Sequence, residues 1–404
     1  MTTNRDAVSG SRALPLSGVR ILAVEQYGAG PFGSMLLTDM GAEVIKIEPP
    51  GAGEMARGVG PYFDESGESQ FFHSFNRNKR SLTLDLKAPE GREIFERLVK
   101  GADAVLNNLR GNQPAKLGLD FASLSPLNPK IVCAHLSAYG REGPRADWPG
   151  FDYLMQAEAG YLSVTGEPEG PPARFGLSVV DMMTGLMAAF GLSSAIVGAR
   201  ATGKGMDVDT SLFDTALHNL GYLATWYLNM GHNQGREPMG GHPSLVPSQL
   251  YQTADGHIFI MCNKEVFWPV LAAKMGHPEW AEDPRFLNFS KRLENKTALN
   301  ALLGPAFKER PTAEWLEKLQ GEVPVSPVHD VKDALENPFV KDSQRIATFE
   351  GPNPLKMLAS PLRIAGAEPP RKAGPKLGQD TDSLLQELGY SEGDIVALRD
   401  KEVV

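Results

Sequence analysis

The stretch VRILAVEQYGAGPFGSMLLTDMGAEVIKIE, residues 19–48, begins and ends with an apolar run. Between these two runs lie a glycine-rich turn and then another apolar segment. The outer runs have the composition of buried strands, and the segment from Phe32 to Gly41 has that of a helix closed by a glycine. A strand, a helix and a second strand in succession favour parallel pairing with a right-handed crossover. The stretch therefore predicts the start of an α/β fold.

The same alternation of strand and helix patterns continues to about residue 140. It predicts a doubly wound, Rossmann-like sheet in a large domain, residues 1–220. Residues 206–231 predict a strand followed by one long helix, and residues 250–262 predict a hairpin. We assign residues 221–335 to a smaller α+β domain. The proline-rich segment 336–404, irregular except for a final helix, is expected to complete the large domain.

Composition excludes several classes of function. The 404 residues carry a formal net charge of −9, which argues against a nucleic-acid partner. Cys133 and Cys262 lie far apart in apolar runs, so we expect inert thiols and no metal site. The N-terminus lacks the apolar core of a signal peptide, and the apolar stretch 185–199 is interrupted by glycines and serines, so we expect it to be too short to span a bilayer. These features predict a cytoplasmic protein without a membrane partner.

The glycine turn has the spacing of a dinucleotide fingerprint at Gly28, Gly30 and Gly33. Pro31 removes one N–H donor, and Glu48 is the only candidate for a ribose-binding acid, so a nicotinamide cofactor is the weaker alternative. Cations follow several predicted strands. An ordinary interpretation makes them solvated loops, but their convergence near the glycine turn favours a phosphate-bearing ligand; they are Arg77, Lys79, Arg80, Lys87, Arg110 and Lys116.

Asp181 lies inside the almost wholly apolar run FGLSVVDMMTGLMAAFG, residues 175–191. The ordinary interpretation is that it caps the helix that follows. A carboxylate at a helix N-terminus is stabilised as the anion, so we expect Asp181 to be ionised at neutral pH. An ionised carboxylate in a pocket can attack an activated acyl group.

Five segments, taken in order, resemble the class III CoA-transferases, which include formyl-CoA, carnitine and succinyl-CoA-dependent enzymes. They are VEQYGAGPFGSMLLTDMGAEVIKIEPPGAGEMAR, FNRNKRSLTLDLKAPEGRE, AKLGLDFASLSPLNPKIV, YGREGPRADWPGFDYLMQAEAG and GLSVVDMMTGLMAAFG. The resemblance runs from about residue 15 to the tail PKLGQDTDSLLQELG. It implies an interlocked, ring-shaped homodimer whose large domain binds CoA. It implies no permanently bound cofactor, because the CoA thioester is itself the substrate.

The resemblance also implies a mechanism in which Asp181 is the nucleophile. CoA moves from an acyl-CoA, with succinyl-CoA as the expected donor, to a free carboxylic acid through anhydride and aspartyl-CoA thioester intermediates. The expected acceptor is a short dicarboxylate or a similar, for example sulfur-containing, acid. Its second acidic group could be bound by Arg57, Arg174 or His242, and the residues alone do not choose among them.

Residues matching the family's CoA site are Gln26, Gly28, Ala29, Leu84, Lys87, Asn108 and Lys116. Gly28 stands where some relatives have glutamine, and Lys116 where many have arginine. The expected substrate residues are Phe151, Asp152, Gly240, Gly241 and His242, the last three as a mobile loop that closes over Asp181. The related α-methylacyl-CoA racemases are the alternative. They resemble this chain but use a histidine where Phe151 stands, and phenylalanine cannot exchange a proton.

Overall fold

The computed structural model describes residues 12–351 and 353–404, so most of the N-terminal stretch examined for a targeting signal lies outside it. These residues form two compact units. The first contains the chain up to Ala159, together with Gly176–Asn219 and Lys341–Val404. The second contains Gly160–Phe175 and Leu220–Val340.

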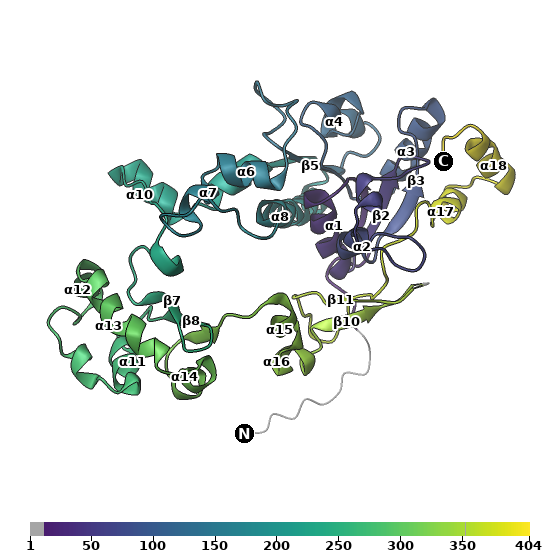
Figure 1. Ribbon diagram of the computed structural model, residues 1–404. Helices are drawn as coiled ribbons and strands as arrows, with labels where there is room; N and C mark the ends of the chain where they lie inside the picture. The colour runs from purple at the N-terminus through teal and green to yellow at the C-terminus, as the bar shows by residue number, and fades with distance from the viewer. Residues whose placement is uncertain (1–11, 352) are drawn as a thin grey trace. The chain divides into compact units, whose positions relative to one another are not determined.

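A six-stranded sheet organises the first unit (Figure 1). Its order is β3-β2-β1-β4-β5-β6 and every neighbouring pair is parallel, which confirms the predicted α/β fold with a parallel sheet. The strand order reverses between β1 and β4, where ligands bind in folds of this kind. The strands are β1 (Arg20–Val24), β2 (Glu43–Glu48), β3 (Arg80–Thr83), β4 (Ala104–Asn107), β5 (Val132–Ser137) and β6 (Met206–Ser211).

Helices connect these strands. The longest are α1 (Ala29–Asp39), α3 (Pro89–Lys100) and α8 (Val179–Thr202). The shorter ones are η1 (Met55–Gly58), α2 (Gln70–Asn76), α4 (Gln113–Lys116), α5 (Phe121–Leu124), α6 (Asp152–Glu158) and α9 (Leu212–His218). Figure 1 shows α1 and α8 side by side, and both helices belong to the first unit, like the sheet.

Helix α8 corrects the expectation that its apolar stretch is broken by glycines. It runs for 24 residues and is long and apolar enough to cross a membrane on length and composition alone. It packs against α1, β5 and β6, as a core helix does. Gly185 and Gly191 lie inside it because packing outweighs their low helix propensity. At Gly185 the backbone of α8 meets the backbone of α1 near Gly33.

The C-terminal segment is more regular than its prolines predicted. It forms an antiparallel pair, β10 (Ile346–Phe349) and β11 (Leu355–Leu358), and two helices, α17 (Thr381–Glu387) and α18 (Glu392–Asp400). Leu384 and Leu398 of these helices share a buried cluster with Leu22 and Val105 of the central strands. Burial of these leucines explains why the tail folds as it does.

The second unit contains the predicted hairpin, β7 (Ser248–Gln252) and β8 (His257–Met261), with β9 (Val325–Pro327) added antiparallel to β8. The long helix expected after residue 206 is instead α9 and α10 (Tyr222–Met230), because Gly221 adopts φ +54° between them. The other helices are α7 (Tyr161–Val164), η2 (Pro238–Gly240), α11 (Phe267–Met275), η3 (Pro278–Ala281), α12 (Phe289–Glu294), α13 (Lys296–Lys308), α14 (Thr312–Leu319) and α15 (Val331–Glu336). Helix α16 (Pro338–Lys341) lies where the two units join in sequence.

Candidate active site

The glycine turn connects β1 to α1 at the point where the strand order reverses. Tyr27 has φ +67°, a left-handed conformation that is uncommon for a residue with a side chain. Asn108, directly after β4, holds the turn: its side-chain oxygen accepts from the N–H of Gln26 at 2.8 Å, and its amide donates to the carbonyl of Gln26 at 2.7 Å. Both ends of the Asn108 amide are therefore occupied by the turn.

Asp181 lies in the first turn of α8 but does not cap it. Ser178 is the N-cap residue and makes no side-chain capping bond. The buried carboxylate of Asp152, at the start of α6, accepts the N–H of Asp181 at 2.9 Å. The capping interpretation of Asp181 is thus wrong: a second aspartate satisfies the helix end, which leaves the Asp181 carboxyl group available.

A cavity of about 440 Å³ in the first unit brings together much of the predicted site. Seven predicted residues line it: Gln26, Gly28, Ala29, Asn108, Arg110, Phe151 and Asp181. Gly28 lies directly against Asp181, since a Cβ at this position would collide with the Asp181 carboxylate oxygen. The turn and the carboxyl group therefore form one wall of the cavity.

Asp181 is not the ionised group that the sequence suggested. Burial, and after it the negative charge of Asp152, raises the pKa of Asp181 to about 7 from its ordinary value of 3.8. Near neutral pH the carboxyl group is therefore partly protonated.

Three of the six predicted phosphate-binding cations, Arg77, Lys79 and Arg80, form ion pairs inside the fold. Lys79 lies 2.7 Å from Glu25 and Arg77 lies 2.6 Å from Asp39, all four being buried. Arg80 pairs with Glu43 at 2.7 Å. The prediction that these three converge on a ligand is wrong, because each compensates a carboxylate of a neighbouring strand or helix.

Arg57 and Glu48 also compensate each other. The Arg57 guanidinium donates to both carboxylate oxygens of Glu48 at 2.7 Å and stacks 3.9 Å from the ring centre of Phe72. Arg57 is therefore not available for an acidic substrate. Glu48 is only 1% exposed, which removes the candidate for ribose binding and with it the support for a nicotinamide cofactor.

The remaining predicted residues lie elsewhere. The Leu84 side chain is buried in the core of the first unit, while Lys87 and Lys116 are exposed outside the cavity lining. Arg174, Gly240, Gly241 and His242 belong to the second unit. Among the other residues that line the cavity, Tyr27 and Trp148 were not predicted to belong to the site. Arg110, which was predicted as a phosphate-binding cation in the loop after β4, also lines the cavity, and it is the one Lys or Arg among the described residues that do so.

Comparison with known proteins identifies the family of this chain. The profile of CoA-transferase family III matches residues 16–381. The chain belongs to CoA-transferase family III. It is 34% identical to the acetyl-CoA:oxalate CoA-transferase of Acetobacter aceti, over 94% of this chain and 97% of that one. It is also 34% identical to the succinyl-CoA–D-citramalate CoA-transferase of Chloroflexus aurantiacus, over 96% and 98% of the two chains.

A solved structure shows the same fold. A CAIB/BAIF family protein from Brucella suis has a TM-score of 0.81 and 33% identity, covering 93% of this chain and 100% of its own. This CoA-transferase thus shares its mixed α/β fold with a solved CAIB/BAIF family protein.

The pH dependence of this CoA-transferase should follow Asp181. Raising the pH through about 7 ionises the carboxyl group, so kcat/KM for acyl-CoA should rise with a midpoint near that pH. In Asp152→Asn the amide oxygen can still accept the N–H of Asp181, but the negative charge is gone. We expect the midpoint to move to lower pH, as measured from initial rates between pH 5 and 9. An unchanged midpoint would contradict the role of Asp152.

Proposed function

We propose that Asp181 is the nucleophile of this CoA-transferase and carries first an acyl group and then CoA. The observation that supports the proposal is the position of the Asp181 carboxyl group, which lines the cavity against Gly28. The backbone N–H of Asp181 donates to the carboxylate of Asp152, so the Asp181 side chain is not needed to cap the helix. A carboxylate suits this chemistry because its attack gives an anhydride, which preserves the activation of the acyl group.

Each step of the proposed reaction exchanges one bond at a carbonyl carbon. The Asp181 carboxylate attacks the thioester carbonyl, which forms a mixed anhydride and releases the CoA thiolate. The thiolate attacks the aspartyl carbonyl, which forms the aspartyl-CoA thioester and releases the first acid as its carboxylate. The incoming carboxylate then attacks the aspartyl carbonyl and displaces the thiolate. Attack of that thiolate on the new acyl group gives the product and restores Asp181.

Binding of CoA is proposed at the carboxyl ends of the strands. Gln26, Gly28 and Ala29 line the cavity beside Asp181. Asn108 would contribute mainly by holding the turn, and Leu84 through its backbone, while Lys87 and Lys116 would attract phosphates from the surface. Arg110 would supply the positive charge at the cavity itself.

Succinyl-CoA as donor and a short dicarboxylate as acceptor remain our proposal. The name of the D-citramalate relative supports succinyl-CoA as the donor, whereas the name of the oxalate relative gives acetyl-CoA. Both names give a short diacid as the acceptor. Racemase activity is not favoured, because Phe151 lines the cavity where the resemblance places the racemase histidine.

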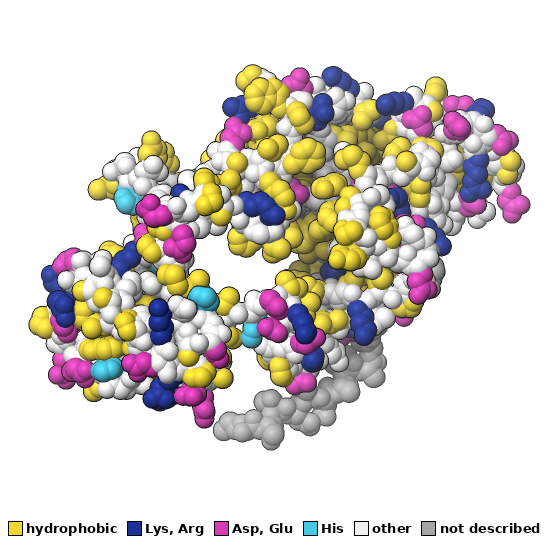
Figure 2. Space-filling view, in the orientation of Figure 1, with side chains coloured by type: hydrophobic (Ala, Val, Ile, Leu, Met, Phe, Trp, Pro, Cys, Tyr) yellow, Lys and Arg dark blue, Asp and Glu magenta, His cyan; other side chains and the backbone are white. Residues whose placement is uncertain are grey.

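We further propose that the two units are the large and small domains of an interlocked homodimer in the cytoplasm. Apolar side chains of α8 that a monomer would leave in water support a partner chain: Leu186 is 54% exposed, Phe190 66% and Val197 70%. Figure 2 shows hydrophobic side chains gathered over the region where Figure 1 labels α1 and α8.

The activity is tested by incubating the protein with unlabelled succinyl-CoA and carbon-labelled oxalate or citramalate. Label entering the thioester fraction is the expected result. Exchange of an α-proton of a branched acyl-CoA without entry of label would establish the racemase instead. A parallel series with acetyl-CoA and formyl-CoA tests the donor, and a strong preference for either would overturn succinyl-CoA.

A further inference from the structure

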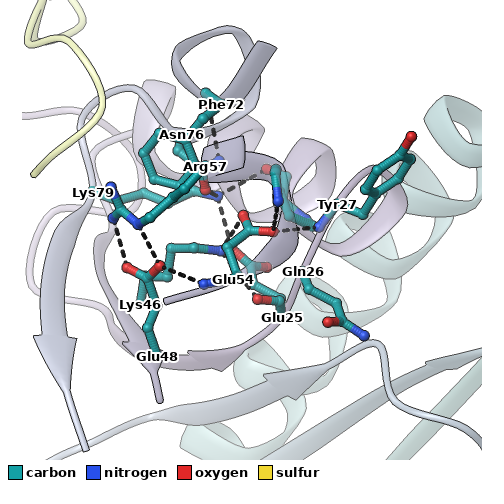
Figure 3. Close-up of polar contacts among 12 residues, drawn as sticks. Glu25, Gln26, Tyr27, Lys46, Glu48, Glu54, Arg57, Phe72, Asn76 and Lys79 are labelled. Carbon is teal, nitrogen blue, oxygen red and sulfur yellow. Dashed lines mark hydrogen bonds and ion pairs between the residues drawn. The ribbon is translucent and has the colours of Figure 1, made fainter. Parts of the chain in front are cut away.

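Four charged side chains form a buried quartet beneath the glycine turn: Glu25, Lys46, Glu54 and Lys79 (Figure 3). None of them is more than 5% exposed. Lys79 Nζ lies 2.7 Å from Glu25 Oε1, and Lys46 Nζ lies 3.1 Å from Glu54 Oε1 and 3.9 Å from Glu25 Oε1. Two positive charges thus face two negative charges at a place that no step of the proposed reaction uses.

Each of three quartet members also binds the backbone of the turn. Lys46 donates to the carbonyl of Glu25 at 3.1 Å, at the start of the turn. Glu54 accepts the N–H of Tyr27 at 2.8 Å, in the middle. Lys79 donates to the carbonyl of Pro31 at 3.0 Å, in the first turn of α1. The quartet therefore holds the turn at both ends and at its centre.

The backbone between these contacts is the part that faces the Asp181 carboxyl group. Tyr27 is in the left-handed conformation, which persists only where its surroundings hold it. The next residue, Gly28, lies against the Asp181 carboxylate. A small rotation of the peptide at Tyr27 would change the room around that carboxylate.

Stability alone does not account for four buried charges. Replacing a buried ion pair by apolar residues of similar size is often neutral or stabilising, because the charges lose their hydration on burial. A position that needs directed donors and acceptors for backbone atoms is different, since apolar side chains cannot supply them.

We propose that Glu25, Lys46, Glu54 and Lys79 are positioning residues that keep the glycine turn in the geometry in which Gly28 faces Asp181. The proposal rests on the proposed function of Asp181. The quartet acts through the backbone of the turn and has no contact with substrate. The functional site thus includes these four buried residues, although none of them lines the cavity.

The first test is the double variant Glu25→Gln/Lys79→Met, which removes one charge of each sign. We expect kcat for CoA transfer to fall by about 10- to 100-fold, with KM for acyl-CoA changed by less than about threefold, because geometry at the reacting group is lost and binding is kept. Formation of the trapped Asp181 adduct in a single turnover should slow by the same factor.

The matched control is Asp39→Asn/Arg77→Met. This pair is equally buried, with a 2.6 Å contact, but its other hydrogen bonds go to Leu358, Asn78 and Thr38 rather than to the glycine turn. We expect a similar fall in melting temperature and a kcat close to that of the unmodified protein. Equal kcat values in the two double variants would overturn the proposal.

A second pair of variants tests the positioning role even if the first double variant does not fold. Glu54→Gln keeps an amide oxygen for the N–H of Tyr27, whereas Glu54→Leu removes the acceptor. We expect Glu54→Gln to retain most of the kcat that Glu54→Leu loses. Equal rates in the two, high or low, would overturn the proposal. An Asp181 adduct in the unmodified protein would meanwhile support the proposed function, and its absence would refute that function separately.

Discussion

Replacing Asp181 by asparagine is expected to reduce CoA transfer by at least about 10⁴-fold, because the amide cannot form the anhydride. Intact-protein mass spectrometry after addition of acyl-CoA, with hydroxylamine or borohydride trapping, should show an adduct on the unmodified protein and none on Asp181→Asn. Peptide mapping should place the adduct at residue 181.

Asp382→Asn is the matched control, because Asp382 also lies in the first turn of a helix of the first unit, α17, but outside the cavity lining. It should transfer CoA at the unmodified rate. Transfer that survives in Asp181→Asn would refute the proposed nucleophile.

Asp181→Asn should also change how the free energy of unfolding depends on pH. The folded-state pKa of Asp181 is about 7, above the ordinary 3.8, so the folded protein binds more protons between these two values. The contribution of the protonated Asp181 carboxyl group to the free energy of unfolding is fully present below about pH 4 and is lost as the pH rises through about 7. Asp181→Asn should therefore melt at a higher temperature than the unmodified protein at pH 8, with the difference shrinking toward pH 5.

Replacing Gly185 by alanine is expected to be the most damaging change outside the carboxyl group itself. A Cβ at Gly185 would collide with the carbonyl oxygen of Ala29, and one at Gly33 would lie 2.5 Å from the carbonyl oxygen of Gly185. These are backbone atoms, so no side-chain rotation relieves the contact and α1 must separate from α8. We expect a loss of about 1–3 kcal/mol in unfolding free energy, and a fall in kcat of about 100-fold as the turn moves away from Asp181.

Gly198→Ala provides the control for this prediction. Gly198 lies in the same helix, and a Cβ there would meet no atom within 4 Å. Alanine should therefore raise stability by about 0.5–1 kcal/mol through its helix propensity. Melting temperatures and transfer rates of both variants give the comparison. Similar behaviour of the two would show that the close approach of the helices does not matter.

Much of the first unit follows from local pattern. The apolar runs at Arg20–Val24, Glu43–Glu48 and Val132–Ser137 became strands of the parallel sheet as predicted. Helix α8 was harder, because its glycines are unfavourable in isolation and are tolerated only where another backbone packs against them. The strands and last helix of the C-terminal segment were missed because its prolines dominate the local pattern.

The candidate site was predictable in part for a similar reason. Gly28 and Asp181 could be singled out because a glycine-rich turn after a strand and a carboxylate in an apolar run are both visible in one dimension. Asn108 was expected to contact the nucleotide, yet its amide binds the backbone of Gln26, 82 positions earlier. Nothing in the neighbouring residues indicates such a partner.

Sequence pattern was sufficient for the sheet, the turn that follows its first strand and the acidic side chain in the apolar helix, because alternation and periodicity record which side of each element is buried. The fold alone decided the state of the charges. Lys79 was predicted to bind phosphate, but it pairs with Glu25, 54 positions earlier, inside the fold. Asp181 was expected to be an anion, but burial and the charge of Asp152, 29 positions earlier, raise its pKa to about 7. Charges act through distance and burial, and both exist only once the strands have been brought together.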